Sequence, residues 1–123
     1  TLAWQCYCRM FYGCTSLTQA PELKATTLAK KCYSYMFNGC KKLKSVTMLA
    51  TDVSKTNCLS DWLYDAGTEA TTRTLKVAKK EAYNAIVEKS YLPTEWKAGT
   101  SGTTILDKDG NDITSTITSS SSN

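Results

Sequence analysis

The sequence predicts an α/β solenoid in which each repeated unit contributes one helix and one short parallel strand. Residues 1–26 align with residues 27–52 without a gap, and eleven of the 26 positions are identical. Most identical positions are apolar or glycine. Stacked units require this composition, because a unit of this size cannot bury its own apolar face. A third, degenerate unit follows in frame, since Cys58 follows Cys32 at the same interval at which Cys32 follows Cys6.

The first part of each unit is expected to be helical. Leu2, Cys6 and Met10 recur every fourth residue, and the second unit repeats this pattern. A spacing of four places side chains on one face of a helix. Gly13 and Gly39 then suit the turn that ends such a helix.

A short strand is expected after each of these turns, at residues 17–20, 43–47 and 73–77. Pro21 should mark the end of the first strand, because proline cannot donate a hydrogen bond within a central strand. The amphipathic pattern of residues 79–90 predicts a capping helix that ends before Pro93. We expect Trp96 to pack over the end of the core, closing a third unit at residues 53–97 and a solenoid domain at residues 1–97.

Residues 98–123 are expected to form a separate tail. Residues 98–102 have the composition of a linker, and apolar residues on both sides of Asp109-Gly110 predict a small β-hairpin. The Ser/Thr-rich end, residues 114–123, is expected to be flexible. Asp107, Asp109 and Asp112 also suggest calcium, but the glutamate at the twelfth position of a calcium loop is missing. A simple turn is therefore favoured, and no metal site is expected.

Composition argues against common enzyme chemistry. The chain has 123 residues, a net charge of +4 and no histidine. The absence of histidine removes the usual general base and the usual partner of a nucleophilic serine or cysteine. The carboxylates form no recognisable pairing motif. We therefore expect a non-catalytic protein without a cofactor. No apolar run approaches the roughly 18 residues of a spanning helix, so no membrane span is expected.

All six cysteines lie in the first half of the chain, from Cys6 to Cys58. Stacking would bury the in-frame cysteines as free thiols, which behave as small hydrophobic groups. A bridge such as Cys6–Cys32 remains an alternative in an oxidising compartment, because neighbouring strands lie about 4.8 Å apart, close to the Cα separation of a disulfide. A zinc site is disfavoured because the closely paired cysteines of such sites are missing.

Three segments carry a resemblance to a known family. They are MFYGCTSLT at residues 10–18, APEL at residues 20–23 and ATTLA at residues 25–29. They resemble the BspA-like leucine-rich repeats (LRR) of bacterial surface proteins of the Bacteroides type. The resemblance covers residues 1–50 well and residues 51–96 loosely. It implies an extracellular, cell-surface protein for adhesion or recognition; decoration of a phage particle surface is an alternative that belongs to the structural role described below. Lys41-Lys42 and Val46-Thr47-Met48 depart from the family pattern.

The strand residues expected to be exposed form the candidate binding surface. A repeat array binds partners along such an extended face, although plain solvation explains any one of these residues equally well. The partner would be a protein or a glycan. The candidate residues are Gln19, Glu22, Lys44, Ser45, Thr47 and Lys76.

Two further features concern partners. Between residues 24 and 55 there are seven lysines and one acid. Such a stretch could meet an acidic partner, although a solvated face is the simpler interpretation. Interleaved aromatic residues are missing, so nucleic acid is not expected. The chain opens within a repeat, as a fragment of a longer protein would, and the predicted hairpin needs a partner. An alternative role is therefore structural: assembly with other subunits, or with a preceding domain, at the N-terminal edge.

Overall fold

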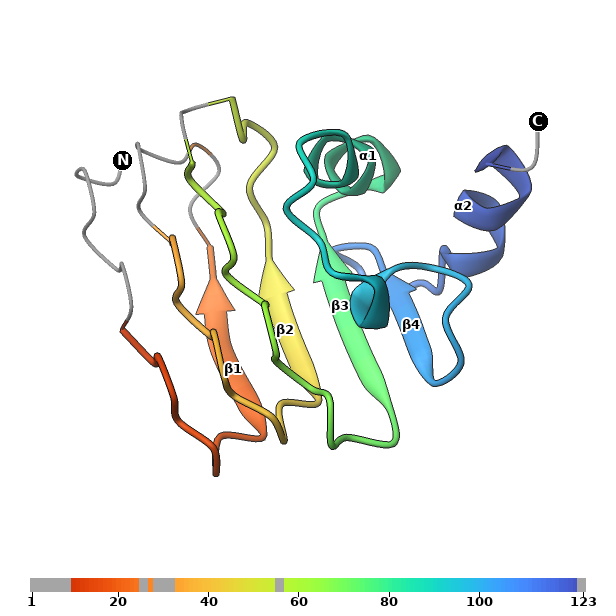
Figure 1. The fold of residues 1–123 in the computed structure, drawn as a ribbon. Helices are drawn as coiled ribbons and strands as arrows, with labels where there is room; N and C mark the ends of the chain where they lie inside the picture. Colours follow the sequence, from red (N-terminus) through yellow and green to blue (C-terminus); the bar gives the residue numbers. More distant parts are fainter. Residues whose placement is uncertain (1–9, 25–26, 28–32, 55–56, 122–123) are drawn as a thin grey trace.

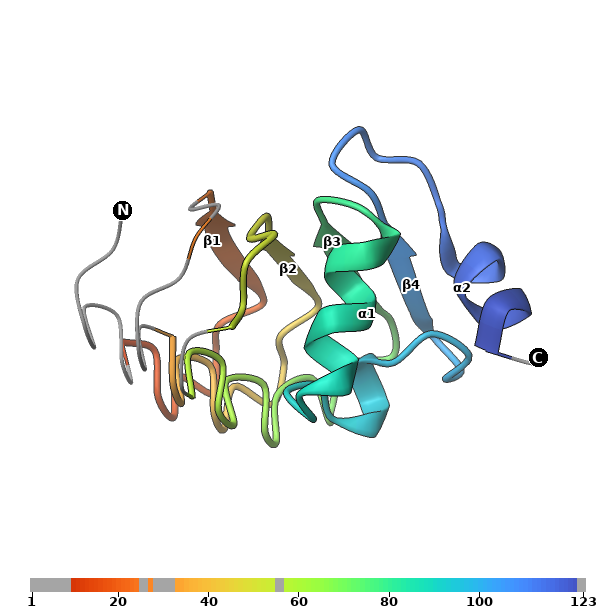
Figure 2. The same cartoon turned by 90° about the horizontal axis from the view of Figure 1, so that it is seen from above.

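The computed structural model describes residues 10–24, 27, 33–54 and 57–121. Its centre is a four-stranded sheet formed by β1 (Gln19–Leu23), β2 (Ser45–Met48), β3 (Arg73–Val77) and β4 (Thr103–Leu106). The strands lie side by side in chain order and every neighbouring pair is parallel (Figure 1). The described connections between consecutive strands lie on one side of this sheet (Figure 2). The predicted parallel strands are thus confirmed within a mixed α/β fold.

Alternation along the strands places the core on one face of the sheet. Val46 pairs with Leu75, and Leu75 with Ile105. All three side chains are completely buried. Because successive side chains of a strand point to opposite faces, the residues between them point away from the core. The buried face packs against the connections and the helix that follows β3.

β1 differs from the prediction at Pro21, which lies within the strand and not at its end. Gln19 pairs with Ser45, but Glu22 pairs with Thr47, so the register shifts between them. An irregularity of this kind leaves a residue outside the ladder. It therefore accommodates a proline, which has no N–H group to donate.

The helix predicted at the start of each unit is not formed in the part of these segments that the structure describes, and this prediction was wrong. Residues 10–13 and 33–39 form turns. The N–H of Phe37 donates to the carbonyl of Trp62 at 2.9 Å, and that of Gly39 donates to Tyr64 at 3.0 Å. Apolar residues at every fourth position are therefore also compatible with a turn segment whose backbone N–H groups donate to carbonyls of the next unit.

The three units keep the same backbone conformation at the turn. Gly13, Gly39 and Asp65, which occupy equivalent positions of the three units, have φ values of 73°, 82° and 60°. In each unit the next residue donates its N–H to the carbonyl three residues earlier. The rings of Phe11 and Phe37, one repeat apart, stack with centroids 5.6 Å apart. The third unit thus retains the turn geometry although both residues of the Gly-Cys pair are replaced.

Helix α1 (Lys80–Glu88) confirms the predicted capping helix. It buries Ala82, Tyr83 and Ile86, and it contacts β3. A short 3-10 helix, η1 (Thr94–Trp96), follows. Trp96 is completely buried, as predicted, and its indole N–H donates to the carbonyl of Ala66 at 2.9 Å.

The predicted tail hairpin is confirmed only in its turn, where the N–H of Ile113 donates to the carbonyl of Ile105 at 2.9 Å; the expectation that its first strand lies outside the sheet was wrong. β4 pairs in parallel with β3, so the sheet continues past the expected boundary at residues 97 and 98. The only antiparallel pairing described after residue 97 is an isolated bridge between Leu106 and Asp112. Helix α2 (Thr114–Ser121) then forms where a flexible end was expected. β4 finds in β3 the pairing partner that an isolated hairpin would lack, and α2 packs Ile117 against the core.

Candidate functional site

The face of the sheet opposite α1, here called the outer face, carries two rows of side chains that cross the strands. Each row follows the strand register, and its members are exposed or half-buried. The first row consists of Gln19, Ser45, Thr74 and Thr104. The second row consists of Glu22, Thr47, Lys76 and Leu106.

The structure brings five of the six predicted binding residues together on the outer face. The sixth, Lys44, is exposed and lies directly before β2. Sequence reasoning missed Thr74, Thr104 and Leu106 in these rows. The alternation in β3 could have revealed Thr74, which lies two residues before Lys76. The other two were missed because their segment was assigned to a hairpin.

The outer face is polar and nearly neutral. Its rows contain hydroxyl groups from four side chains, those of Ser45, Thr47, Thr74 and Thr104. Glu22 is balanced by Lys24, whose Nζ lies 3.6 Å from its carboxylate, and both side chains are largely exposed. Hydroxyl groups donate and accept hydrogen bonds, so this face suits a partner that offers both kinds of group. Neither row contains an aromatic side chain.

A groove of about 290 Å³ opens where the strands begin. Gln19 of β1 pairs with Ser45 of β2, which lies 26 residues later in the sequence. Ser45 pairs with Thr74 of β3, which lies 29 residues later, so the second connection is longer. The additional residues lie before β3 and supply one wall of the groove. The lining residues are Thr18, Lys42, Lys44, Glu69, Ala70 and Thr71.

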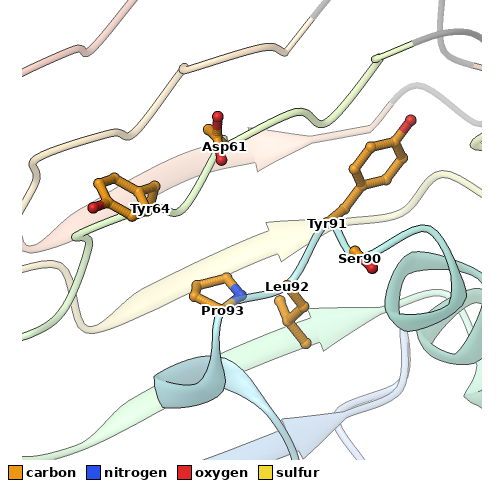
Figure 3. A pocket seen from close by; sticks show the side chains of 6 residues that line it. All are labelled: Asp61, Tyr64, Ser90, Tyr91, Leu92 and Pro93. Atoms are coloured by element: carbon orange, nitrogen blue, oxygen red, sulfur yellow. The ribbon is translucent and has the colours of Figure 1, made fainter.

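A smaller hollow of about 120 Å³ lies between the turns of the third unit and the segment after α1. Figure 3 shows Asp61 and Tyr64 on one wall and residues 90–93 on the other. The rings of Tyr64 and Tyr91 lie at opposite ends in this view, so they do not form a pair of facing rings that would clamp a planar ligand.

Arg73, the first residue of β3, fixes the loops beside the groove. Its side chain is buried, and its guanidinium donates to the carbonyls of Gly67, Ala70, Glu95 and Ser101 at 2.8–3.0 Å. Every one of these partners lies in the protein itself. We therefore assign Arg73 a structural role that holds the wall formed by residues 69–71.

The described cysteines do not form a reactive centre. Cys14, Cys40 and Cys58 are free thiols, of which the latter two are buried. Burial raises the pKa of Cys40 and raises the pKa of Cys58 to about 11. A thiol that resists ionisation is a poor nucleophile and a poor metal ligand. The alternative Cys6–Cys32 bridge lies outside the described residues.

Among the described residues, no three acidic, histidine or cysteine side chains are placed to hold a metal ion. The turn after β4 uses its own carboxylates. Asp107 accepts the N–H groups of Asp109 and Asn111, both at 2.9 Å. The bond from Asn111 is the largest cause that lowers the pKa of Asp107. The carboxylate of Asp107 therefore stabilises the turn itself.

Comparisons of the chain with protein-family models, curated proteins and solved structures find no match. Within the described ranges, no helix has both the length and the hydrophobicity that crossing a bilayer requires.

Proposed function

We propose that this chain is a BspA-like leucine-rich-repeat solenoid that binds a protein partner across its outer face, without catalysis, at a bacterial cell surface. The observation that carries the proposal is the pair of cross-strand rows, which gathers five residues predicted from sequence alone into one continuous surface. Extended faces of this kind are the binding surfaces of repeat proteins.

The chemistry of the outer face favours a protein over a glycan. Aromatic rings give sugar-binding surfaces an apolar platform with a fixed geometry, and neither row contains one. Hydroxyl groups, one amide and one free ammonium group instead match the mixed donors and acceptors of a polypeptide surface. Lys76 carries that ammonium at the centre of the second row, between Thr47 and Leu106.

The test uses immobilised panels of extracellular proteins and of glycans. The variant Thr47→Arg/Thr74→Arg places bulk and charge on the outer face, and Glu81→Arg on the exposed side of α1 is its control. We expect at least one protein to bind, with a loss of about tenfold or more, or about 1.4 kcal/mol, in the outer-face variant alone. Binding to glycans alone would contradict the proposal, as would equal losses in both variants. Self-association abolished by the outer-face variant would instead favour the assembly role.

A further inference from the structure

We infer that the groove at the strand starts binds a carboxylate side chain, so that the protein partner presents an acidic segment to Lys42 and Lys44. This inference rests on the proposed function and specifies the chemistry of that partner. It uses a feature that the outer face leaves unexplained, which is the concentration of lysines between residues 24 and 55.

The first argument is charge that the described residues leave uncompensated. Two lysines of this stretch have acidic neighbours, since Lys24 lies 3.6 Å from Glu22 and Lys41 lies 4.0 Å from Asp65. In the described part of the chain, Lys42 and Lys44 form no such ion pair. Both line the same groove. Of the four lysines of this stretch that the structure describes, the two without an ion pair therefore lie at the same groove.

The second argument is that the backbone beneath the two ammonium groups is fixed. Leu43 lies between the two lysines and is completely buried. The N–H of Lys44 donates to the carbonyl of Thr18 at 2.7 Å, and its own carbonyl accepts the N–H of Thr74 at 2.8 Å. The backbone that carries the two lysines is thus already held before a ligand binds, which lowers the entropic cost of binding.

The third argument concerns size and the remaining lining. A volume of about 290 Å³ is far larger than the roughly 30 Å³ share of one water molecule, so the groove admits an amino-acid side chain and its backbone. Thr18 and Thr71 add hydroxyl groups. Glu69 brings a negative charge to the same groove, which weakens the binding of any anionic ligand. It can accept a peptide N–H, so a peptide acid fits better than a sulfated or uronic-acid polymer.

Two residues that line the groove directly precede, or lie shortly before, residues of the first row. Lys44 directly precedes Ser45 of the first row, and Thr71 lies shortly before Thr74 of the same row. One partner can therefore contact the rows while an acidic side chain reaches the groove.

The test is a titration of the whole chain with poly-L-glutamate at low ionic strength, where exposed charges are least screened. Binding is measured from the changes in NMR chemical shift of the backbone amides that line the groove. Polygalacturonate and heparin are titrated in parallel. Lys42→Gln/Lys44→Gln removes the free charges, and Lys24→Gln/Lys41→Gln removes the same charge from the paired lysines.

We expect the groove variant to lose about threefold to tenfold in affinity for polyglutamate, the range that two exposed charge pairs give. The control should lose less than about twofold, and Glu69→Gln should bind more tightly. Equal losses in the two lysine variants would overturn the inference, as would absent binding or tighter binding of either polysaccharide.

The protein panel separates this inference from the proposed function. If Lys42→Gln/Lys44→Gln binds the protein partner normally while Thr47→Arg/Thr74→Arg does not, the inference is wrong and the proposed function stands. If polyglutamate binds the groove but the outer-face variant leaves partner binding unchanged, the proposed function is wrong.

Discussion

Replacing Arg73 by methionine should destabilise the fold severely, because this side chain joins three separate segments to β3. Its Nη1 atom donates to Gly67 and Ala70, and its Nη2 atom donates to Ser101. Its Nε atom donates to the carbonyl of Glu95 at 2.8 Å. Methionine preserves much of the aliphatic stem but supplies none of these donors.

The magnitude follows from the acceptors that lose their partner. A hydrogen bond to a charged group contributes about 1.5–3 kcal/mol, and four carbonyls would give an upper bound of roughly 6–12 kcal/mol. Several of these contacts are only partly buried, so water can replace the guanidinium there. Methionine also avoids the cost of burying a charge. We therefore expect a loss of about 3–5 kcal/mol, in the range for removing one member of a buried charged contact.

Urea denaturation followed by tryptophan fluorescence measures this loss as the free energy of unfolding. Arg73→Lys should recover less than half of it, because one ammonium group cannot reach acceptors on several sides. Lys76→Met, on the same strand but on the outer face, is the control and should change stability by no more than about 0.5 kcal/mol. A loss below about 1 kcal/mol for Arg73→Met would refute the assignment of Arg73 as the residue that holds these loops.

Three further predictions concern glycine and cysteine. A Cβ at Gly67 would lie 2.8 Å from the carbonyl oxygen of Leu43, whereas one at Gly110 would meet nothing within 4 Å. In thermal denaturation, Gly67→Ala should therefore lower the free energy of unfolding by at least about 1 kcal/mol more than Gly110→Ala does. Equal losses in the two variants would contradict the packing around Gly67. Burial raises the pKa of Cys58 from 9.0 to about 11, so the unfolded thiol ionises first as the pH rises. The free energy of unfolding should be insensitive to this thiol below pH 9 and should fall by up to about 2.7 kcal/mol between pH 9 and pH 11; a Cys58→Ala variant with an equally steep decline would rule this out. Iodoacetamide should label the exposed Cys14 in the native protein while sparing the buried Cys40 and Cys58, as peptide mapping by mass spectrometry would show; equal labelling of all three would be inconsistent with the fold.

The strands were predictable because their alternation directly reflects burial on one face. The sequence Arg73 to Val77 alternates buried and half-buried residues in the structure, and its bounds were predicted correctly. The helices of the repeat units were not predictable in this way. Tyr33, Met36, Phe37 and Cys40 are all buried, so the spacing identified core residues correctly. It could not show that the backbone between them would bond to the next unit.

The outer face and the groove differ in how far local sequence determines them. The outer face follows from the repeat only in part. Gln19 and Ser45 occupy equivalent positions and pair with each other, whereas Ser45 pairs with Thr74, 29 residues later, which the repeat does not predict. The wall formed by Glu69, Ala70 and Thr71 lies in an insertion that only the third unit has, so the repeat does not predict it. The placement of β4 depends on pairing with β3, a contact between segments far apart in the sequence, whereas the local turn signal at Asp109-Gly110 favoured a hairpin.

The most direct test of the account is a set of interstrand nuclear Overhauser effects on the isotopically labelled chain. The strands of successive units pair in parallel and in chain order. We therefore expect cross-peaks between Val46 and Leu75 and between Leu75 and Ile105. The absence of cross-peaks between Val46 and Leu75 and between Leu75 and Ile105 would contradict both the sheet and the binding surface that depends on it.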